Sequence, residues 1–232
     1  MKYQYSEIKN SFHDTEPWVN VFVLKYLTLP LVYLMVNYTR ITPNIISFIS
    51  LFLGVFSAFL YFIGFELEAS FMYICSYIFD ATDGKVARIT GKGKVYGAWL
   101  DTFVDRLNLV LISLAISYNH YELYGSISFL LLNNMFLGLS FIGWESRYNI
   151  DYYILSNNIS RCDINRESKY SRWCKRHGVI KEPISLPELF LFYFVFISHF
   201  SEIISVLSLI MIVLFLILRI IKQQFFWKDV SC

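Results

Sequence analysis

Long apolar runs constrain this chain more than any other feature of its sequence. The clearest covers residues 45–65 and contains no charged side chain. About 20 residues of helix cross the hydrocarbon core of a bilayer, so this run has the length of a membrane span. The chain is also 56% hydrophobic and 19% aromatic, which is more than the core of a soluble domain requires. The sequence therefore predicts an integral membrane protein.

Six segments are candidate membrane helices. They cover approximately residues 45–65, 68–89, 96–118, 121–144, 186–199 and 202–221. Helices satisfy every backbone N–H and C=O group internally, which a bilayer requires because it offers no water. A transmembrane β-barrel would need short strands of alternating polarity, and these continuous runs do not show them. We therefore predict an all-α, polytopic membrane protein with six transmembrane helices.

The N-terminal part of the chain needs a separate interpretation. Residues 18–38 are rich in aromatic and aliphatic side chains but also contain a lysine, a proline and two asparagines. This mixture favours an amphipathic helix in the membrane interface, with a seventh crossing as the structural alternative. The predicted organisation is an interfacial region at residues 1–41 and a six-helix transmembrane domain at residues 42–232, with a basic loop at residues 145–185.

Lysine and arginine are distributed asymmetrically along the chain. The loops around residues 65–68, 119–122 and 198–202 contain neither, whereas basic residues flank the other ends of the same segments. Cytoplasmic loops carry the excess of Lys and Arg in membrane proteins. We therefore expect both termini, the turn near residues 90–95 and the 145–185 loop on the cytoplasmic side, a parity that six crossings satisfy.

Four aspartates interrupt the second and third apolar segments. A charge at membrane depth costs roughly 2.5–3.5 kcal/mol on insertion scales, so four carboxylates need compensation. At about 100° per residue, Asp80 and Asp83 lie about 60° apart on one helix, and Asp101 and Asp105 lie about one turn apart on the next. A short Gly-Lys-Gly-Lys turn joins the two helices. Antiparallel packing can therefore direct all four carboxylates at one place.

The chemistry of this cluster indicates a metal site. Its ligands would be oxygen atoms without His or Cys, which suits Mg²⁺ or Mn²⁺, and four carboxylates can hold two ions. Magnesium commonly retains substrate phosphates as ligands, so the site predicts a phosphate-bearing substrate. Gly84 and Ala87 leave the adjoining helix face bare, and Arg88 follows to meet negative charge. Asn44 either touches a polar ligand or only marks the start of a helix after Pro43.

Eight positions around the aspartates form a recognisable pattern. They read Asp80, Asp83-Gly84, Ala87-Arg88, eight residues, Gly97, three residues, Asp101, three residues and Asp105. This pattern resembles the complete signature of the CDP-alcohol phosphotransferase family, the class I CDP-alcohol phosphatidyltransferases. The rest of the chain is similar more loosely, in its six predicted helices, its interfacial helix and the Thr-Pro-Asn at residues 42–44.

The resemblance implies an enzyme that transfers a substituted phosphate from a CDP-alcohol to an acceptor alcohol and releases CMP. The residues implied to bind metal are Asp80, Asp83, Asp101 and Asp105, and those implied to line the nucleotide pocket are Gly84, Ala87 and Arg88. Asp105 is also implied to be the general base. Homodimers are common in the family, and we expect no nucleic-acid partner.

The two alcohols are harder to identify. We favour CDP-diacylglycerol as the donor, in phospholipid headgroup synthesis. The alternative is the transfer of a small head group from a CDP-linked amino alcohol or phosphonate to a lipid or glycan. Arg147 is the candidate for binding the acceptor, and the basic loop could bind anionic lipids or simply reflect its cytoplasmic position. Glu188 stands where family members that accept phosphorylated alcohols usually carry a basic residue, which argues against such an acceptor.

Other interpretations of the polar residues remain open at this point. Paired carboxylates in membrane helices also occur in cation or proton-coupled transporters, and a relative that has lost catalysis would keep the fold. A transporter does not require small residues in register with the acids. Asn133 and Asn134 are either hydrogen-bonding groups between helices or donors that line a pocket.

Overall fold

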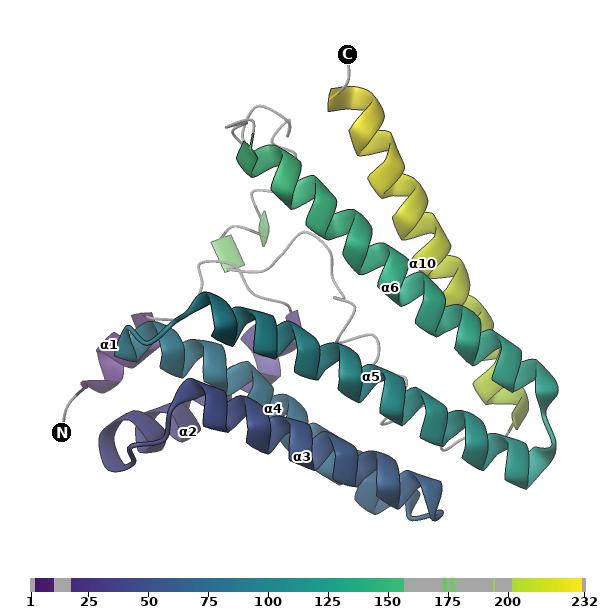
Figure 1. Cartoon of the computed structure of the whole chain (residues 1–232), viewed down its shortest axis with the longest axis horizontal. Coiled ribbons are helices and arrows are strands. Elements are labelled where there is room, and N and C mark those ends of the chain that lie inside the picture. Colours follow the sequence, from purple (N-terminus) through teal and green to yellow (C-terminus); the bar gives the residue numbers. More distant parts are fainter. Residues whose placement is uncertain are drawn as a thin grey trace.

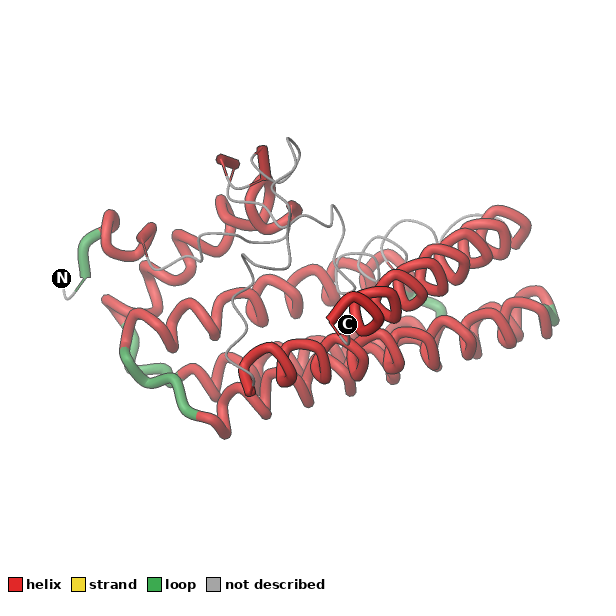
Figure 2. Tube along the Cα trace, turned by 90° about the horizontal axis from the view of Figure 1, so that it is seen from above, coloured by secondary structure: helices red, strands yellow, loops and turns green. Residues whose placement is uncertain are grey.

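The computed structural model describes residues 3–10, 18–156, 173–174, 176–177, 194 and 202–230. Its elements are α1 (Tyr5–Asn10), the π-helical turn η1 (Asn20–Leu24), α2 (Lys25–Tyr38), α3 (Pro43–Phe62), α4 (Glu66–Thr90), α5 (Val95–Tyr124), α6 (Ile127–Ser156) and α10 (Glu202–Val230). Helices joined by short turns make up these ranges, without a strand (Figure 2). The prediction of an all-α protein is therefore confirmed.

Four of these helical stretches are long and apolar enough to cross a membrane. By length and composition they are Asn20–Tyr38, Pro43–Phe62, Ile127–Ile150 and Glu202–Ile221. Helices α4 and α5 have sufficient length but are more polar, because they carry the aspartates and the arginines beside them. The count of six crossings is not confirmed, since the predicted span at residues 186–199 lies outside the described residues except for Phe194.

The segment before α3 differs from the expectation of a purely interfacial helix. η1 and α2 together form a stretch of 19 residues that also qualifies as a candidate span. Its physical basis is the nearly continuous apolar sequence on both sides of Pro30, which helix α2 accommodates in its interior. Placement in the interface therefore stays a prediction.

Helices α4 and α5 both pack against α3, while α6 and α10 form a second pair that crosses this group obliquely and contacts it through α5 (Figure 1). α4 ends at Thr90 and is capped by Gly91, whose φ of 65° is a left-handed conformation that glycine adopts readily. The chain reverses there and begins α5 at Val95. This tight turn places the end of α4 next to the start of α5, as the sequence predicted.

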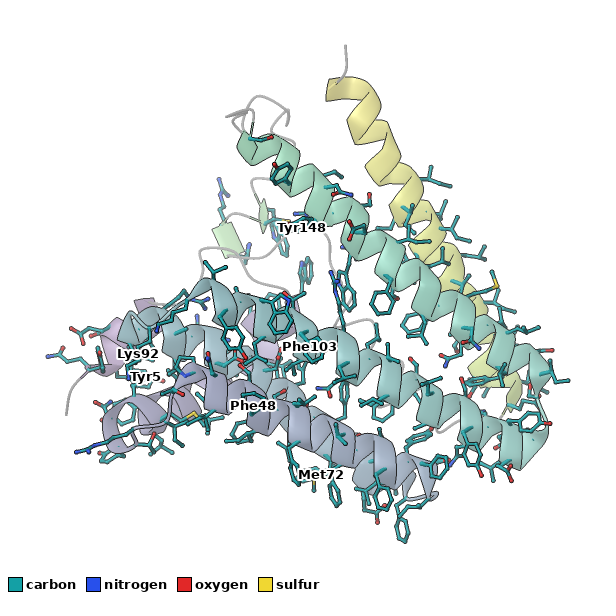
Figure 3. The ribbon with its side chains drawn as sticks, viewed as in Figure 1. Tyr5, Phe48, Met72, Lys92, Phe103 and Tyr148 are labelled. Carbon is teal, nitrogen blue, oxygen red and sulfur yellow. The ribbon has the colours of Figure 1, made fainter. Side chains whose placement is uncertain are left out.

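A small apolar cluster packs the N-terminal helices against that same end of the molecule. It joins Ile8 of α1 and Val32 of α2 to Ile46 of α3 and Val86 of α4. Figure 3 shows Tyr5 of α1 and Lys92 of the α4–α5 turn at one end of the long helices. The N-terminal region thus covers the part of α3 and α4 from which the predicted site is built.

The opposite half of the molecule has a larger apolar core with polar links between helices. Tyr61, Phe129, Phe136 and Leu209 are among its fully buried members. Asn133 of α6 is 1% exposed, and its Nδ2 donates to the backbone oxygen of Ser113 and to Ser117 Oγ on α5, at 2.8 and 2.7 Å. Asn133 is therefore a hydrogen-bonding group between helices.

Asn134 behaves differently from its neighbour. Its side chain is exposed and donates to the Leu130 carbonyl of its own helix at 2.8 Å. Of the two interpretations offered for this pair of asparagines, the interhelical one thus applies to Asn133, whereas Asn134 makes a local bond within α6.

Candidate active site

The four aspartates project from the adjoining ends of α4 and α5. Asp80 and Asp83 lie in the last three turns of α4, and Asp101 and Asp105 lie in the second and third turns of α5. One carboxylate oxygen from each of Asp80, Asp83 and Asp101 lies within 4.8 Å of the other two. The helical spacing and the Gly91 turn together produce this convergence.

Asp105 joins the same cluster through Asp80. Asp105 lies close enough to Asp80 for the two carboxyl groups to interact electrostatically, and Asp101 lies close enough to Asp83 to do the same. Ionised carboxylates at such separations repel, unless a proton or a cation lies between them. The structure therefore brings Asp80, Asp83 and Asp101 together, with Asp105 beside them.

The donor set fits a divalent cation. Asp80 Oδ1 is buried and makes no hydrogen bond with any described residue. An unpartnered buried carboxylate oxygen is costly, and oxygen ligands alone suit Mg²⁺ or Mn²⁺. Asp80, Asp83 and Asp101, with Asp105 beside them, are thus the residues that would hold such an ion.

The start of α3 lies against this carboxylate cluster. Ser47 Oγ donates a hydrogen bond to Asp83 Oδ2, and both side chains are buried. Asn44, also near the start of α3, approaches Gly97 of α5. A Cβ atom on Gly97 would lie only 3.3 Å from Asn44 Oδ1. Asn44 therefore reaches the first turn of α5, one turn before Asp101, and its role in binding a ligand stays a prediction.

Positive charges surround the carboxylates. Arg88 lies close enough to Asp83 to stabilise it electrostatically, and Arg106 does the same for Asp105. The Arg106 guanidinium lies 5.7 Å from the ring centroid of Trp144 on α6, a cation–π contact that ties α5 to α6. Lys85 is buried within α4 at 3% exposure.

The other predicted residues take the positions that their helices dictate. Gly84 and Ala87 are half-buried on α4, and a Cβ atom on Gly84 would meet Arg88 Nη1 at an ordinary 3.6 Å. Arg147 is exposed on α6, one turn beyond Trp144. The predicted loop at 145–185 is wrong in its first part, because residues 145–156 continue helix α6. Most of the rest of that segment, and Glu188, lie outside the described residues.

Two residues of the site were missed by the sequence analysis. Ser47 belongs to a stripe on α3, spaced by three and four residues, that also includes Ser50, Gly54 and Ser57. Small residues with that spacing in an apolar helix indicate a face in close contact with neighbouring helices, which was the available signal. Arg106 carries a signal of its own, because it is a charge inside a predicted span.

Part of the chain matches a known protein family. Residues 40–153 match the family model of the CDP-alcohol phosphatidyltransferases. The archaetidylinositol phosphate synthase of Pyrococcus horikoshii is 31% identical over 68 residues, which cover 29% of this chain and 36% of that protein. The chain thus matches only about a third of the length of this curated relative.

A solved structure extends the likeness to the whole fold. The crystal structure of Mycobacterium tuberculosis phosphatidylinositol phosphate synthase, determined with CDP-DAG bound, superposes with a TM-score of 0.62 over 87% of this chain and 94% of that chain. The sequence identity is 15%, so this likeness concerns the fold. The matched region at residues 40–153 contains all eight positions of the aspartate pattern. Residues 40–153 are thus a CDP-alcohol phosphatidyltransferase domain, which belongs to a family of transferases.

Proposed function

We propose that this protein transfers a phosphatidyl-type group from a CDP-alcohol, with CDP-diacylglycerol as the favoured donor, to an acceptor alcohol and releases CMP. The proposal rests on the convergence of three carboxylates, those of Asp80, Asp83 and Asp101, where α4 is joined to α5. Asp80 Oδ1 is buried there without a hydrogen-bond partner among the described residues, and Asp105 lies beside the cluster. A diphosphate can complete the coordination of a divalent cation held there.

The reaction balances with the groups that the site provides. The acceptor oxygen forms a bond to the phosphorus that carries the donor alcohol, and the bond from that phosphorus to the bridging oxygen breaks, so that CMP departs. Asp105 takes the proton of the acceptor hydroxyl, an assistance typically worth about 10²–10⁴-fold. Bound Mg²⁺ or Mn²⁺ would supply charge neutralisation at the attacked phosphate and at the leaving group.

The positions around the carboxylates support this assignment. Gly84 and Ala87 leave space along α4 for a nucleotide, and Arg88 supplies a positive charge beside it. Asn44 lies across from Gly97 at the same end of the site. Arg147 remains our candidate for binding the acceptor, because it follows Trp144 by one turn on α6.

The active site and both termini are proposed to face the cytoplasm, and a homodimer is proposed from the family resemblance.

The donor proposal rests on the fold and on the relatives. The structurally similar protein was crystallised with CDP-DAG bound, and both similar proteins are named as synthases of inositol phosphate lipids. We therefore include inositol phosphate among the acceptors to test, together with glycerol phosphate. Unphosphorylated alcohols are tested as well, because Glu188 argues against a phosphorylated acceptor.

The experiment offers the purified protein CDP-diacylglycerol, CDP-choline or CDP-ethanolamine with Mg²⁺ and each acceptor. CMP and the lipid product are followed by mass spectrometry. We expect CMP release with CDP-diacylglycerol, its loss on chelation of divalent metal and its return on adding Mg²⁺. Asp105→Asn should abolish release while the protein stays folded and membrane-inserted. Full activity of that variant would refute the role of Asp105, and a transporter would release no CMP from any donor.

A further inference from the structure

We infer that Ser47 is a positioning residue for the metal centre, because its hydroxyl holds the carboxylate of Asp83 in place for the cation. Its Oγ donates to Asp83 Oδ2 across the interface between α3 and α4, with exposures of 3% for Ser47 and 4% for Asp83. The inference rests on the proposed function, since it concerns a ligand of the proposed metal site.

The carboxylate is the preferred acceptor of this hydroxyl. Ser47 Oγ also lies 3.3 Å from the backbone oxygen of Pro43 in its own helix. A hydroxyl has a single proton to donate, and a bond to an ionised carboxylate is roughly twice as strong as one to a neutral carbonyl. The buried proton of Ser47 is therefore directed at Asp83.

A carboxylate needs such a partner to act as a defined ligand. The terminal torsion of an aspartate is broad, so the side chain alone does not fix the direction of its two oxygens. Asp101 repels Asp83, whose other partners are the backbone N–H of Gly84 and the positive charge of Arg88, both on its own helix. Ser47 adds a hydroxyl donor from the facing helix α3. With Oδ2 held by Ser47, rotation of the carboxylate is restricted. Groups that orient metal ligands in this way typically contribute 10–100-fold to metal affinity or activity.

The neighbouring serines of the same stripe provide a contrast. Ser50 Oγ donates to the backbone oxygen of Ser76 on α4 at 3.0 Å, and Ser57 Oγ donates to the backbone oxygen of Ala69 at 2.7 Å. Both are as buried as Ser47 and both connect α3 to α4. Their partners are backbone oxygens and, for Ser50, also the Ser76 hydroxyl at 3.2 Å, rather than carboxylates. These contacts hold the two helices together and do not involve the predicted metal ligands.

This contrast defines the experiment. Ser47→Ala, Ser47→Thr and Ser50→Ala are purified in detergent, and Mn²⁺ binding is measured by electron paramagnetic resonance in the absence of any nucleotide. The Mg²⁺ concentration for half-maximal CMP release is measured in parallel. We expect Ser47→Ala to weaken both about 10–100-fold. Ser47→Thr, which keeps the hydroxyl, should recover most of the affinity, and Ser50→Ala should bind Mn²⁺ as the unaltered protein does.

The outcomes separate this inference from the proposed function. Equal Mn²⁺ affinity in Ser47→Ala and Ser50→Ala would overturn the positioning role, and so would a failure of the unaltered protein to bind Mn²⁺. Weaker Mn²⁺ binding in Ser47→Ala alone would support it even if no CDP-alcohol yielded CMP, in which case only the proposed function would fail. Thermal unfolding of the variants is followed alongside, and a Ser47→Ala protein as stable as Ser50→Ala shows that the loss is local.

Discussion

Gly54 of α3 packs directly against the side chain of Asn108 of α5, and this contact yields a prediction about stability. A Cβ atom at position 54 would overlap the whole Asn108 amide group, and its distance to Nδ2 would be 2.5 Å. Real Cβ contacts do not approach so closely, so Gly54→Ala must displace Asn108 or separate the two helices. Since Asn108 is 6% exposed, its amide has little room to move.

The size of the effect follows from two opposing terms. Overpacking a well-packed core costs about 1–3 kcal/mol, and the severity of this overlap favours about 3. Replacing glycine by alanine inside a helix returns about 1 kcal/mol of conformational entropy. The net destabilisation is therefore about 2 kcal/mol, which corresponds to a fall of roughly 4–8 °C in the melting temperature of a chain of this size.

Thermal unfolding in detergent, followed by tryptophan fluorescence, measures this change. Gly138→Ala on α6 is the matched control, because nothing lies within 4 Å of its Cβ position. It should leave the melting temperature unchanged or raise it. The double variant Gly54→Ala/Asn108→Ala should regain most of the lost stability, since the overlap is removed and the Asn108 bond to Ser76 Oγ is long, at 3.5 Å. If Gly54→Ala unfolds no earlier than the unaltered protein, or if the second substitution brings no recovery, the proposed packing is wrong.

Two further predictions concern the helix contacts and the orientation. Asn133→Ala removes two hydrogen bonds between α5 and α6 and should destabilise the protein by about 0.6–1.7 kcal/mol in the same assay. Asn134→Ala removes only a bond within α6 and should change the stability little. Equal effects of the two substitutions would contradict the interhelical role of Asn133. Single cysteines in place of Lys92 and Glu122, in a background without the natural cysteines, should react with an impermeant thiol reagent from opposite sides of sealed vesicles. Labelling of both from the same side would exclude the predicted orientation.

The sequence predicted the helices and the facing carboxylates because both depend on local geometry. The period of an α-helix places Asp80 and Asp83 on one side of α4, and the same period aligns Asp101 with Asp105 on α5. The turn at Gly91 needs only a residue that adopts a positive φ. These features require no knowledge of the rest of the chain. The number of crossings is less local, because length and apolarity do not by themselves separate a spanning helix from an interfacial one, as the Asn20–Tyr38 stretch illustrates.

The tertiary structure alone decided which side chains support the aspartates. Ser47 and Asp83 are 36 positions apart in the sequence, and only the packing of α3 on α4 brings the hydroxyl to the carboxylate. The contact of Arg106 with Trp144 likewise depends on how α6 crosses α5. Spacing along one helix determines the direction of a side chain, whereas its partner on another helix depends on the distance and rotation at which the two helices pack. The sequence thus determined where the carboxylates point, and the packing of α3 and α6 determined what holds them there.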